Sequence, residues 1–186
     1  MLGNSSAIFN PVICNLLARI NPESILELGC GEGKLGDLAK QSNLMPKLTA
    51  VQKLFSKSDL LHLNSKGYTN IIGSNILEYF KEGFDDVYDL IVAMDVIEHF
   101  LYSDAISIID FALYKSKWLL LVWPSKPPQS GISNKFDRHR TSFELGTLTN
   151  LFDVAYYEQR GFAQVNYLHR YHLCVLLGHM NSANFS

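Results

Sequence analysis

The 186-residue sequence has little of several features that mark specialised classes of protein. It contains only three cysteines, and the spacing of Cys14, Cys30 and Cys174 fits no metal-binding motif. Its formal net charge is only −2, so it lacks the basic excess of most nucleic-acid-binding proteins. Charged residues make up 18% and hydrophobic residues 47% of the chain, a balance typical of a globular protein rather than a disordered one.

No apolar run in the sequence has the length and purity of a membrane span. The stretch Ala7–Ile20 is fairly apolar, but it contains Asn10, Pro11 and Arg19 and lacks the basic region of a secretory signal. We expect it to form an amphipathic helix within residues 1–22. The odd number of cysteines and the lack of a signal favour a reducing compartment, so the sequence predicts a cytoplasmic protein with no membrane span.

Short apolar runs alternate with helical segments along most of the chain, with no internal repeat or linker. This alternation is typical of a mostly parallel sheet with crossover helices. The predicted strands are Ser24–Leu28, Lys47–Val51, Thr69–Gly73, Tyr88–Met94 and Trp118–Trp123. The predicted helices between them are Leu35–Ser42, Leu54–Ser65, Ile76–Phe80 and Asp104–Lys115. The length suits one domain over residues 1–186, without a separate substrate domain.

The last third of the chain departs from this alternation. A loop rich in proline, serine and glycine occupies residues 124–141 and is expected to cover the substrate side. A helix over Ser142–Phe152, capped by Ser142, is predicted to follow. Two strand-like runs, Val154–Gln159 and Ala163–Leu177, are separated by three residues, which favours an antiparallel hairpin.

The most informative segment is Ile25–Lys34, with the sequence ILELGCGEGK. An apolar strand runs directly into Gly29, Gly31 and Gly33, and a helix is predicted to begin behind them. Glycine suits these positions because the backbone must turn tightly and approach a ligand without interference from Cβ atoms. The free N–H groups and the positive dipole end of the helix favour an anionic group. The loop therefore predicts a ligand site at the carboxyl end of the strand.

Residues 31–36 also match the GxGxxG pattern of dinucleotide-binding proteins. The match begins two residues beyond the strand end, and the second strand closes near Gln52, where a dinucleotide-binding protein places an acidic residue for the ribose. Glu27 also bears on the choice between a dinucleotide and another ligand, because a carboxylate within an apolar strand is costly without a partner. Either Glu27 is tied to backbone N–H groups or a nearby lysine, or it serves the ligand.

Three segments together resemble the class I S-adenosylmethionine (SAM)-dependent methyltransferases. They are ILELGCGEG at Ile25–Gly33, YDLIVAMDVIEHF at Tyr88–Phe100 and FDRHRTSFE at Phe136–Glu144. The resemblance extends over nearly the whole chain. It implies an α/β fold with a Rossmann-like seven-stranded, mostly parallel sheet, a C-terminal antiparallel hairpin and helices on both faces. It also implies SAM as the cofactor.

The resemblance implies a set of cofactor-binding residues in the glycine loop or at strand ends. They are Glu27, Gly29, Cys30, Gly31, Gly33, Gln52, Asn75, Asp95 and Val96. In the family, an acid at the position of Gln52 holds the ribose hydroxyls, and an Asp at the position of Asn75 accepts a hydrogen bond from the adenine amino group. The two amides forfeit charge-assisted hydrogen bonds, which costs about 1–3 kcal/mol of binding energy in sum.

The segment Asp95-Val-Ile-Glu-His99 follows the fourth strand, where open α/β sheets bind their ligands. If Asp95 begins a helical turn, then Glu98 and His99 share its face. The trio serves either as a general base with its partners or as ligands of a hard divalent cation. We expect Glu98, His99 and the later His139 to be the catalytic residues, with His99 or His139 as the general base for an oxygen acceptor.

Three functions agree with these features. The leading one is methylation of a small-molecule acceptor on oxygen or nitrogen, without a metal, a nucleic-acid partner or a membrane. The second is a metal-dependent RNA 2′-O-methyltransferase, because the segment resembles the metal site of small-RNA methyltransferases; its ligands here would be Asp95, Glu98, His99 and His139. The third is a non-catalytic SAM-fold protein. Residues His169–His172 are interpreted as ordinary strand residues.

Overall fold

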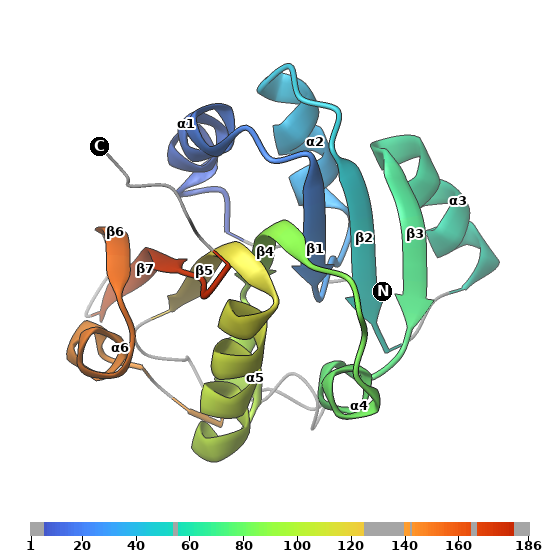
Figure 1. Cartoon of the computed structure of the whole chain (residues 1–186). Helices are drawn as coiled ribbons and strands as arrows, with labels where there is room; N and C mark the ends of the chain where they lie inside the picture. The colour runs from blue at the N-terminus through green and yellow to red at the C-terminus, as the bar shows by residue number, and fades with distance from the viewer. Residues whose placement is uncertain (1–5, 54–55, 125–139, 142, 165–166, 181–186) are drawn as a thin grey trace. The chain divides into compact units, whose positions relative to one another are not determined.

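The computed structural model (Figure 1) describes residues 6–53, 56–124, 140–141, 143–164 and 167–180. The strands are β1 (Ser24–Leu28), β2 (Lys47–Gln52), β3 (Tyr68–Gly73), β4 (Tyr88–Met94), β5 (Ser116–Pro124), β6 (Val154–Gln164) and β7 (Tyr167–Leu177). They form a seven-stranded sheet in the order β3-β2-β1-β4-β5-β7-β6. The order and the antiparallel C-terminal strands confirm the predicted Rossmann-like α/β class.

The helices are α1 (Asn10–Ile20), α2 (Lys34–Gln41), α3 (Lys57–Lys66), α4 (Ile76–Glu82), α5 (Tyr102–Tyr114), α6 (Leu145–Leu151) and the 3-10 turn η1 (Ile97–His99). The predicted helices therefore occur, with their ends shifted by a few residues. Glu144 is the N-cap of α6, whereas Ser142, its predicted cap, lies outside the described residues. So does most of the loop predicted over residues 124–141. In the described part of the chain, none of the helices combines the length and apolarity needed to cross a bilayer.

The chain divides into two compact units, Met1–Val92 and Ala93–Ser186. In the first unit β1, β2 and β3 pair in parallel, and the right-handed rule for crossovers places α2 and α3 on one face and α4 on the other. Helices α1 and α2 lie against each other, as do α2 and α3 (Figure 1). The strands β1 and β2 are buried almost throughout, as expected of parallel strands covered on both faces.

Gly36 allows the close approach of α2 to the end of α3. A Cβ atom on Gly36 would lie 2.4 Å from the backbone oxygen of Lys66, a distance that real Cβ atoms do not reach. The third glycine of the apparent GxGxxG match therefore serves helix packing. Gly33, three residues before Gly36, adopts a left-handed conformation with φ +76° immediately before α2 begins.

We expect Gly36→Ala to lower the free energy of unfolding by about 1–3 kcal/mol, because the added methyl group forces α2 and α3 apart. Gly146→Ala in α6 is the matched control, since a Cβ at Gly146 meets nothing within 4 Å. Urea denaturation of both variants measures the difference. Equal stability of Gly36→Ala and Gly146→Ala would show that the helices accommodate the methyl group without cost.

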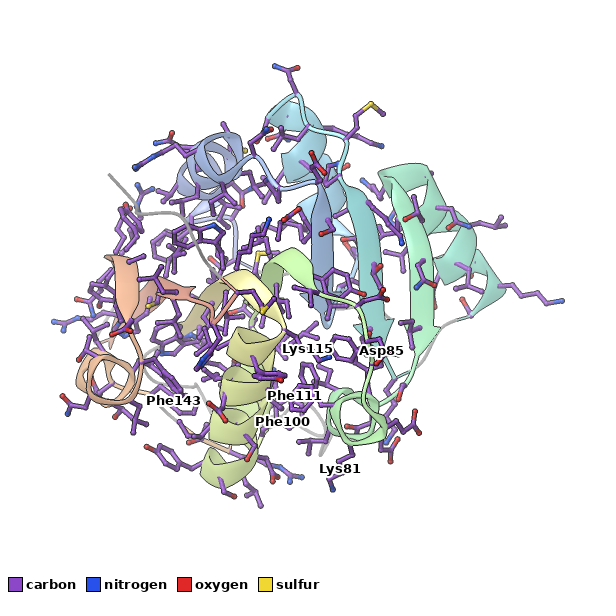
Figure 2. All side chains as sticks on the ribbon, viewed as in Figure 1. Lys81, Asp85, Phe100, Phe111, Lys115 and Phe143 are labelled. Atoms are coloured by element: carbon purple, nitrogen blue, oxygen red, sulfur yellow. The ribbon has the colours of Figure 1, made fainter. Side chains whose placement is uncertain are left out.

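In the second unit β7 lies between β5 and β6, antiparallel to both. The buried Trp123 of β5 donates a hydrogen bond from Nε1 to the Phe143 backbone oxygen (2.9 Å) and stacks on His172 of β7, with ring centroids 5.1 Å apart. Phe143 lies beside α5 (Figure 2), and its ring stacks on that of Tyr102 at 5.4 Å. These contacts fix the chain ahead of α6 against β5 and α5.

The predicted hairpin boundary is wrong. Arg160, Gly161 and Phe162 do not separate two strands; they continue β6, which pairs with β7 from Val154 to Gln164. The prediction placed the turn in the three residues that separate the two strand-like runs. One glycine is tolerated within a strand because the ladder hydrogen bonds of its neighbours persist on both sides.

Candidate functional site

The glycine loop has the conformation that its composition predicts. Gly29, Gly31 and Gly33 have φ angles of +70°, +50° and +76°, which are strained for residues with a side chain. The Gly29 N–H donates to the Val51 oxygen (2.9 Å), and the Gly33 N–H donates to the Cys30 oxygen (2.8 Å). The loop is thus attached to the end of β2 at one side and closed on itself at the other.

Gln52, the last residue of β2, holds the middle of this loop. Its Oε1 accepts hydrogen bonds from the Gly31 N–H (2.8 Å) and from the Cys30 Sγ (3.5 Å). Burial raises the pKa of the Cys30 thiol, so this side chain is a neutral donor. An amide oxygen is sufficient to order the loop from this position, and the predicted contact of Gln52 with a ribose stays a prediction.

Asn75 follows β3 and caps the next helix. Its Oδ1 accepts a hydrogen bond from the Leu77 N–H (2.9 Å) at the start of α4. This capping role explains a neutral Asn here, because Asn is among the best N-cap residues. The predicted hydrogen bond to an adenine would need a second interaction of the same short side chain.

Glu27 of β1 is buried, with 1% of its surface exposed, and it has a partner that the sequence did not reveal. The hydroxyl of Tyr68, at the start of β3, donates a hydrogen bond to Glu27 Oε2. Burial raises the Glu27 pKa to about 8, although the Tyr68 hydrogen bond and the charge of Lys34 oppose the rise. A tyrosine two strands away carries no sequence signal that links it to Glu27, so only the fold identifies the pair.

We expect the free energy of unfolding to depend on pH through Glu27. Between the unfolded value near 4.5 and the folded value near 8, the folded protein keeps a proton that the unfolded chain has lost. The free energy of unfolding therefore falls as pH rises through this window, by up to about 1.4 kcal/mol per pH unit from this group. Urea denaturation at pH 5 and pH 8 should show a smaller fall in Glu27→Gln than in the unchanged protein.

Tyr68→Phe is the second variant in this test. It removes a hydrogen bond that lowers the Glu27 pKa, so the pH range over which the free energy of unfolding falls should extend to higher pH. Identical pH dependence in the unchanged protein and Glu27→Gln would mean that Glu27 titrates normally.

In the second unit, the segment after β4 differs from the predicted helical turn. Asp95 adopts a left-handed conformation with φ +54°, while its N–H still donates to the Val122 oxygen of β5 (2.9 Å). Helical geometry begins only at Ile97, as the single 3-10 turn η1. Asp95, Glu98 and His99 therefore do not share one helical face, because sheet pairing holds Asp95 up to the sharp turn. Val96, within that turn, is buried.

Glu98 is the most unusual residue of this segment. It is 1% exposed, and within the described residues neither carboxyl oxygen has a hydrogen-bond partner. Burial, and next the charge of Asp95, raise its pKa well above the ordinary carboxyl value. Its backbone oxygen accepts hydrogen bonds from the N–H groups of Arg140 (2.7 Å) and Thr141 (3.2 Å). An unpaired buried carboxyl is rare because it is costly, and such groups concentrate at functional sites.

His99 and His139 are the remaining predicted catalytic residues. His99 is partly exposed at the end of η1, and His139 lies outside the described residues. Across the residues that the structure describes, no three His, Cys, Asp or Glu side chains gather as metal ligands do. The predicted metal set included His139, so it is untested as a whole.

Tyr171 of β7 is a further residue near Glu98. It lies opposite Pro124, where β5 ends. Its pKa is raised by burial and by the charges of Asp95 and Glu98, which places its side chain within electrostatic reach of both carboxylates. This part of β7 was predicted to be ordinary sheet. The register of β7 against β5 is the feature that brings Tyr171 to the end of the strand, and it depends on the hairpin that was misplaced.

The contacts of His172, the neighbour of Tyr171, are those of a packed strand residue. Its Nδ1 lies 2.7 Å from the Tyr157 hydroxyl, and its ring stacks between Trp123 and Tyr157. Burial lowers the His172 pKa, so the neutral ring is favoured. The interpretation of His172 as a sheet residue agrees with these contacts.

Comparison with known structures supports the fold. The methyltransferase domain of bacterial CtHen1-CN is 19% identical, with a TM-score of 0.60, and the match covers 90% of this chain and 96% of that one. The N-methyltransferase NodS from Bradyrhizobium japonicum WM9, in complex with S-adenosyl-L-homocysteine (SAH), is 16% identical, with a TM-score of 0.62 and coverages of 92% and 88%.

TehB from Haemophilus influenzae gives a TM-score of 0.65 at 16% identity; the match covers 94% of this chain and 64% of TehB. No curated protein matches the sequence. Residues 9–181 match the family described as Methyltransferase domain. With the glycine loop and the strand order, this match over most of the chain confirms SAM-dependent methyl transfer and SAM as the cofactor. The chain belongs to the methyltransferase domain family and is a SAM-dependent methyltransferase.

Proposed function

We propose that this methyltransferase acts on a small-molecule acceptor, at oxygen or nitrogen, and that Glu98 removes the acceptor's proton. The observation that carries the proposal is the buried Glu98 carboxyl, which has no partner in the described part of the chain. SAM, when bound, supplies a methyl group already activated on a sulfonium. The protein therefore needs mainly to bind, to orient and to hold one proton.

The residues of the first unit fit a SAM-binding role. Gly29, Gly31 and Gly33 all have positive φ angles, which give the loop the tight turn expected of a cofactor-binding loop. Glu27 suits the cationic amino group at the methionine end of SAM. Burial destabilises the ionised Glu27 carboxylate, and a cation beside it would stabilise that form. Gln52 supports the loop through Gly31, and we propose that its amide also serves the ribose. The predicted cofactor contacts of Asn75 in the first unit, and of Asp95 and Val96 in the second, stay predictions.

In the second unit Glu98 suits a general base better than its neighbours do. A carboxyl with a raised pKa accepts a proton near neutral pH, which an ordinary carboxylate does poorly. His99, one residue on and partly exposed, is the second candidate, and His139 is the third. NodS, whose structure contains SAH, is an N-methyltransferase with a similar fold, which supports nitrogen among the acceptor atoms.

The test is a measurement of SAH release from SAM with two groups of acceptors, small amines and alcohols on one side and short RNA on the other. The proposal predicts SAH release with members of the first group, unaffected by EDTA. Methylation of RNA that EDTA abolishes would contradict it and favour the metal-dependent 2′-O-methyltransferase. No release with any acceptor, despite SAH binding, would contradict it as well.

A further inference from the structure

The strand β6 ends the sheet, and its outer edge meets no other strand in the described part of the chain. It pairs with β7 on one side, at the end of the order β3-β2-β1-β4-β5-β7-β6 (Figure 1). From Tyr156 to Gln164 each residue of β6 pairs with one residue of β7, after a single irregularity between Val154 and Tyr156. Such an edge presents a row of backbone N–H and C=O groups that another strand can join.

The side chains of Tyr156, Glu158 and Arg160 lie on one face of β6, because alternate residues of a strand point the same way. The Tyr156 hydroxyl donates to Glu158 Oε2 (2.7 Å), and Arg160 Nε donates to Glu158 Oε1. The side chains of Glu158 and Arg160 keep 25% and 38% of their surface exposed. A strand that joins this edge therefore meets one negative and one positive charge, two residues apart.

A second copy of β6 complements this pattern when the two strands run antiparallel with Gln159 opposite Gln159. In that register Glu158 of each copy stands directly opposite Arg160 of the other, at about 4.5–5.5 Å between Cβ atoms. Each of the four charges then has an opposite charge beside it in its own strand and another across the strand pair. A shift of two residues in either direction places Glu158 opposite Glu158, or Arg160 opposite Arg160, which is destabilising.

The opposite face of β6 favours the same register. Gln159 is exposed, and its amide would meet the same amide of the second copy, each with hydrogen-bond donors and an acceptor. Tyr157 would stand opposite Gly161, so its ring can cover the exposed backbone of a residue without a side chain. The Tyr157 hydroxyl lies 2.7 Å from His172 Nδ1 on β7, which orients the ring on this face. Charge, amide and aromatic pairs thus agree on one alignment.

We propose that two copies of this chain associate through β6, antiparallel and centred on Gln159, so that their sheets become continuous. No residue of β6 was assigned to the cofactor or to the acceptor, so this interface is independent of the proposed function. The strand at the other edge, β3, fits a second copy less well. It has six residues against the eleven of β6, and it carries no charged residue that would fix a register.

A second explanation of Glu158 and Arg160 is that they protect the edge of β6 against pairing. Natural edge strands often carry charged residues, especially lysine, for this purpose. Charges of one sign repel a second copy of the same strand, because like charges then stand opposite each other. Glu158 and Arg160 have opposite signs and match a second β6 instead. The two explanations predict opposite oligomeric states, a monomer under protection and a dimer under pairing.

The experiment measures the sedimentation velocity of the full chain from about 1 to about 100 μM, where we expect a reversible dimer with a Kd on the order of 10 μM. Arg160→Glu and Glu158→Arg each place like charges opposite each other at both ends of the register, so each should raise Kd about 10-fold or more. An equimolar mixture of the two variants should dimerise again, because opposite charges then face each other. Lys57→Glu, an equal charge change at an exposed position of α3, is the matched control and should dimerise normally.

Each outcome decides for or against the interface. A monomeric unchanged protein at about 100 μM overturns the proposal, as does a dimer that persists in both charge-reversal variants or a mixture of them that stays monomeric. Far-UV circular dichroism checks that the variants fold. If one does not, hydrogen exchange of the unchanged protein decides. The amides of Tyr156–Gly161 should exchange several-fold more slowly at the high concentration than at the low one, whereas those of β3 should not change. Equal exchange at β6 overturns the proposal.

Discussion

Glu98→Gln is expected to lower kcat by about 100-fold or more while leaving the protein as stable as before or more stable. The carboxyl is buried and unpaired in the described structure, so an amide of the same shape removes a base without removing a protein contact. Because burial raises the Glu98 pKa, the ionised form destabilises the fold above the ordinary carboxyl value near 4.5. The free energy of unfolding of the variant should therefore exceed that of the unchanged protein as pH rises.

The measurement pairs steady-state SAH release with urea denaturation at pH 5 and pH 8. Glu158→Gln is the matched control, because Glu158 is an acid of the same unit that accepts hydrogen bonds from Arg160 and Tyr156. It should keep its activity. A Glu98→Gln variant that loses stability and activity together would indicate a structural role for the carboxyl and no role as a base.

Gly31→Arg is expected to abolish binding of SAM and SAH while the protein stays folded. Gly31 has φ +50°, a conformation that costs a residue with a side chain about 1–2 kcal/mol. Its N–H donates to Gln52, so a shift of the backbone also breaks the contact that orders the loop. A long charged side chain would also add bulk and a positive charge to this tight loop. An affinity loss of about 100-fold or more follows from these effects together.

Gly146→Arg in α6 is the matched control, since the space around Gly146 is open. Isothermal titration with SAH should give the same affinity for this control as for the unchanged protein. Far-UV circular dichroism checks that Gly31→Arg is folded. Normal SAH affinity in folded Gly31→Arg would remove the glycine loop from the cofactor site.

The architecture was predictable because its signals are local. The strands β1 and β4 occupy the predicted residues, since buried apolar runs bounded by glycine or aspartate are strong strand signals. The glycine loop was predictable for the same reason, as only glycine accommodates three positive φ angles so close together. The turn at Asp95 was not predictable, because a left-handed aspartate has no distinct local pattern and sheet pairing with Val122 decided it.

The candidate site was predictable only in part, because its partnerships are long-range. Glu27 could be singled out as a costly buried charge, but its partner Tyr68 stands two strands away. Glu98 was expected to act within a helical turn, whereas the structure isolates its carboxyl. Tyr171 depends on the register between β7 and β5, which no local pattern specifies.

The most direct test of the account is a thermal-shift titration of the unchanged protein and Gly31→Arg with SAH. The cofactor loop should bind SAH, so the midpoint of the unchanged protein should rise progressively with SAH, with about 2.7 kcal/mol of added stability at 100 times Kd. Gly31→Arg should show no rise. An unchanged midpoint of the parent protein at millimolar SAH would contradict the claim that its glycine loop holds the cofactor.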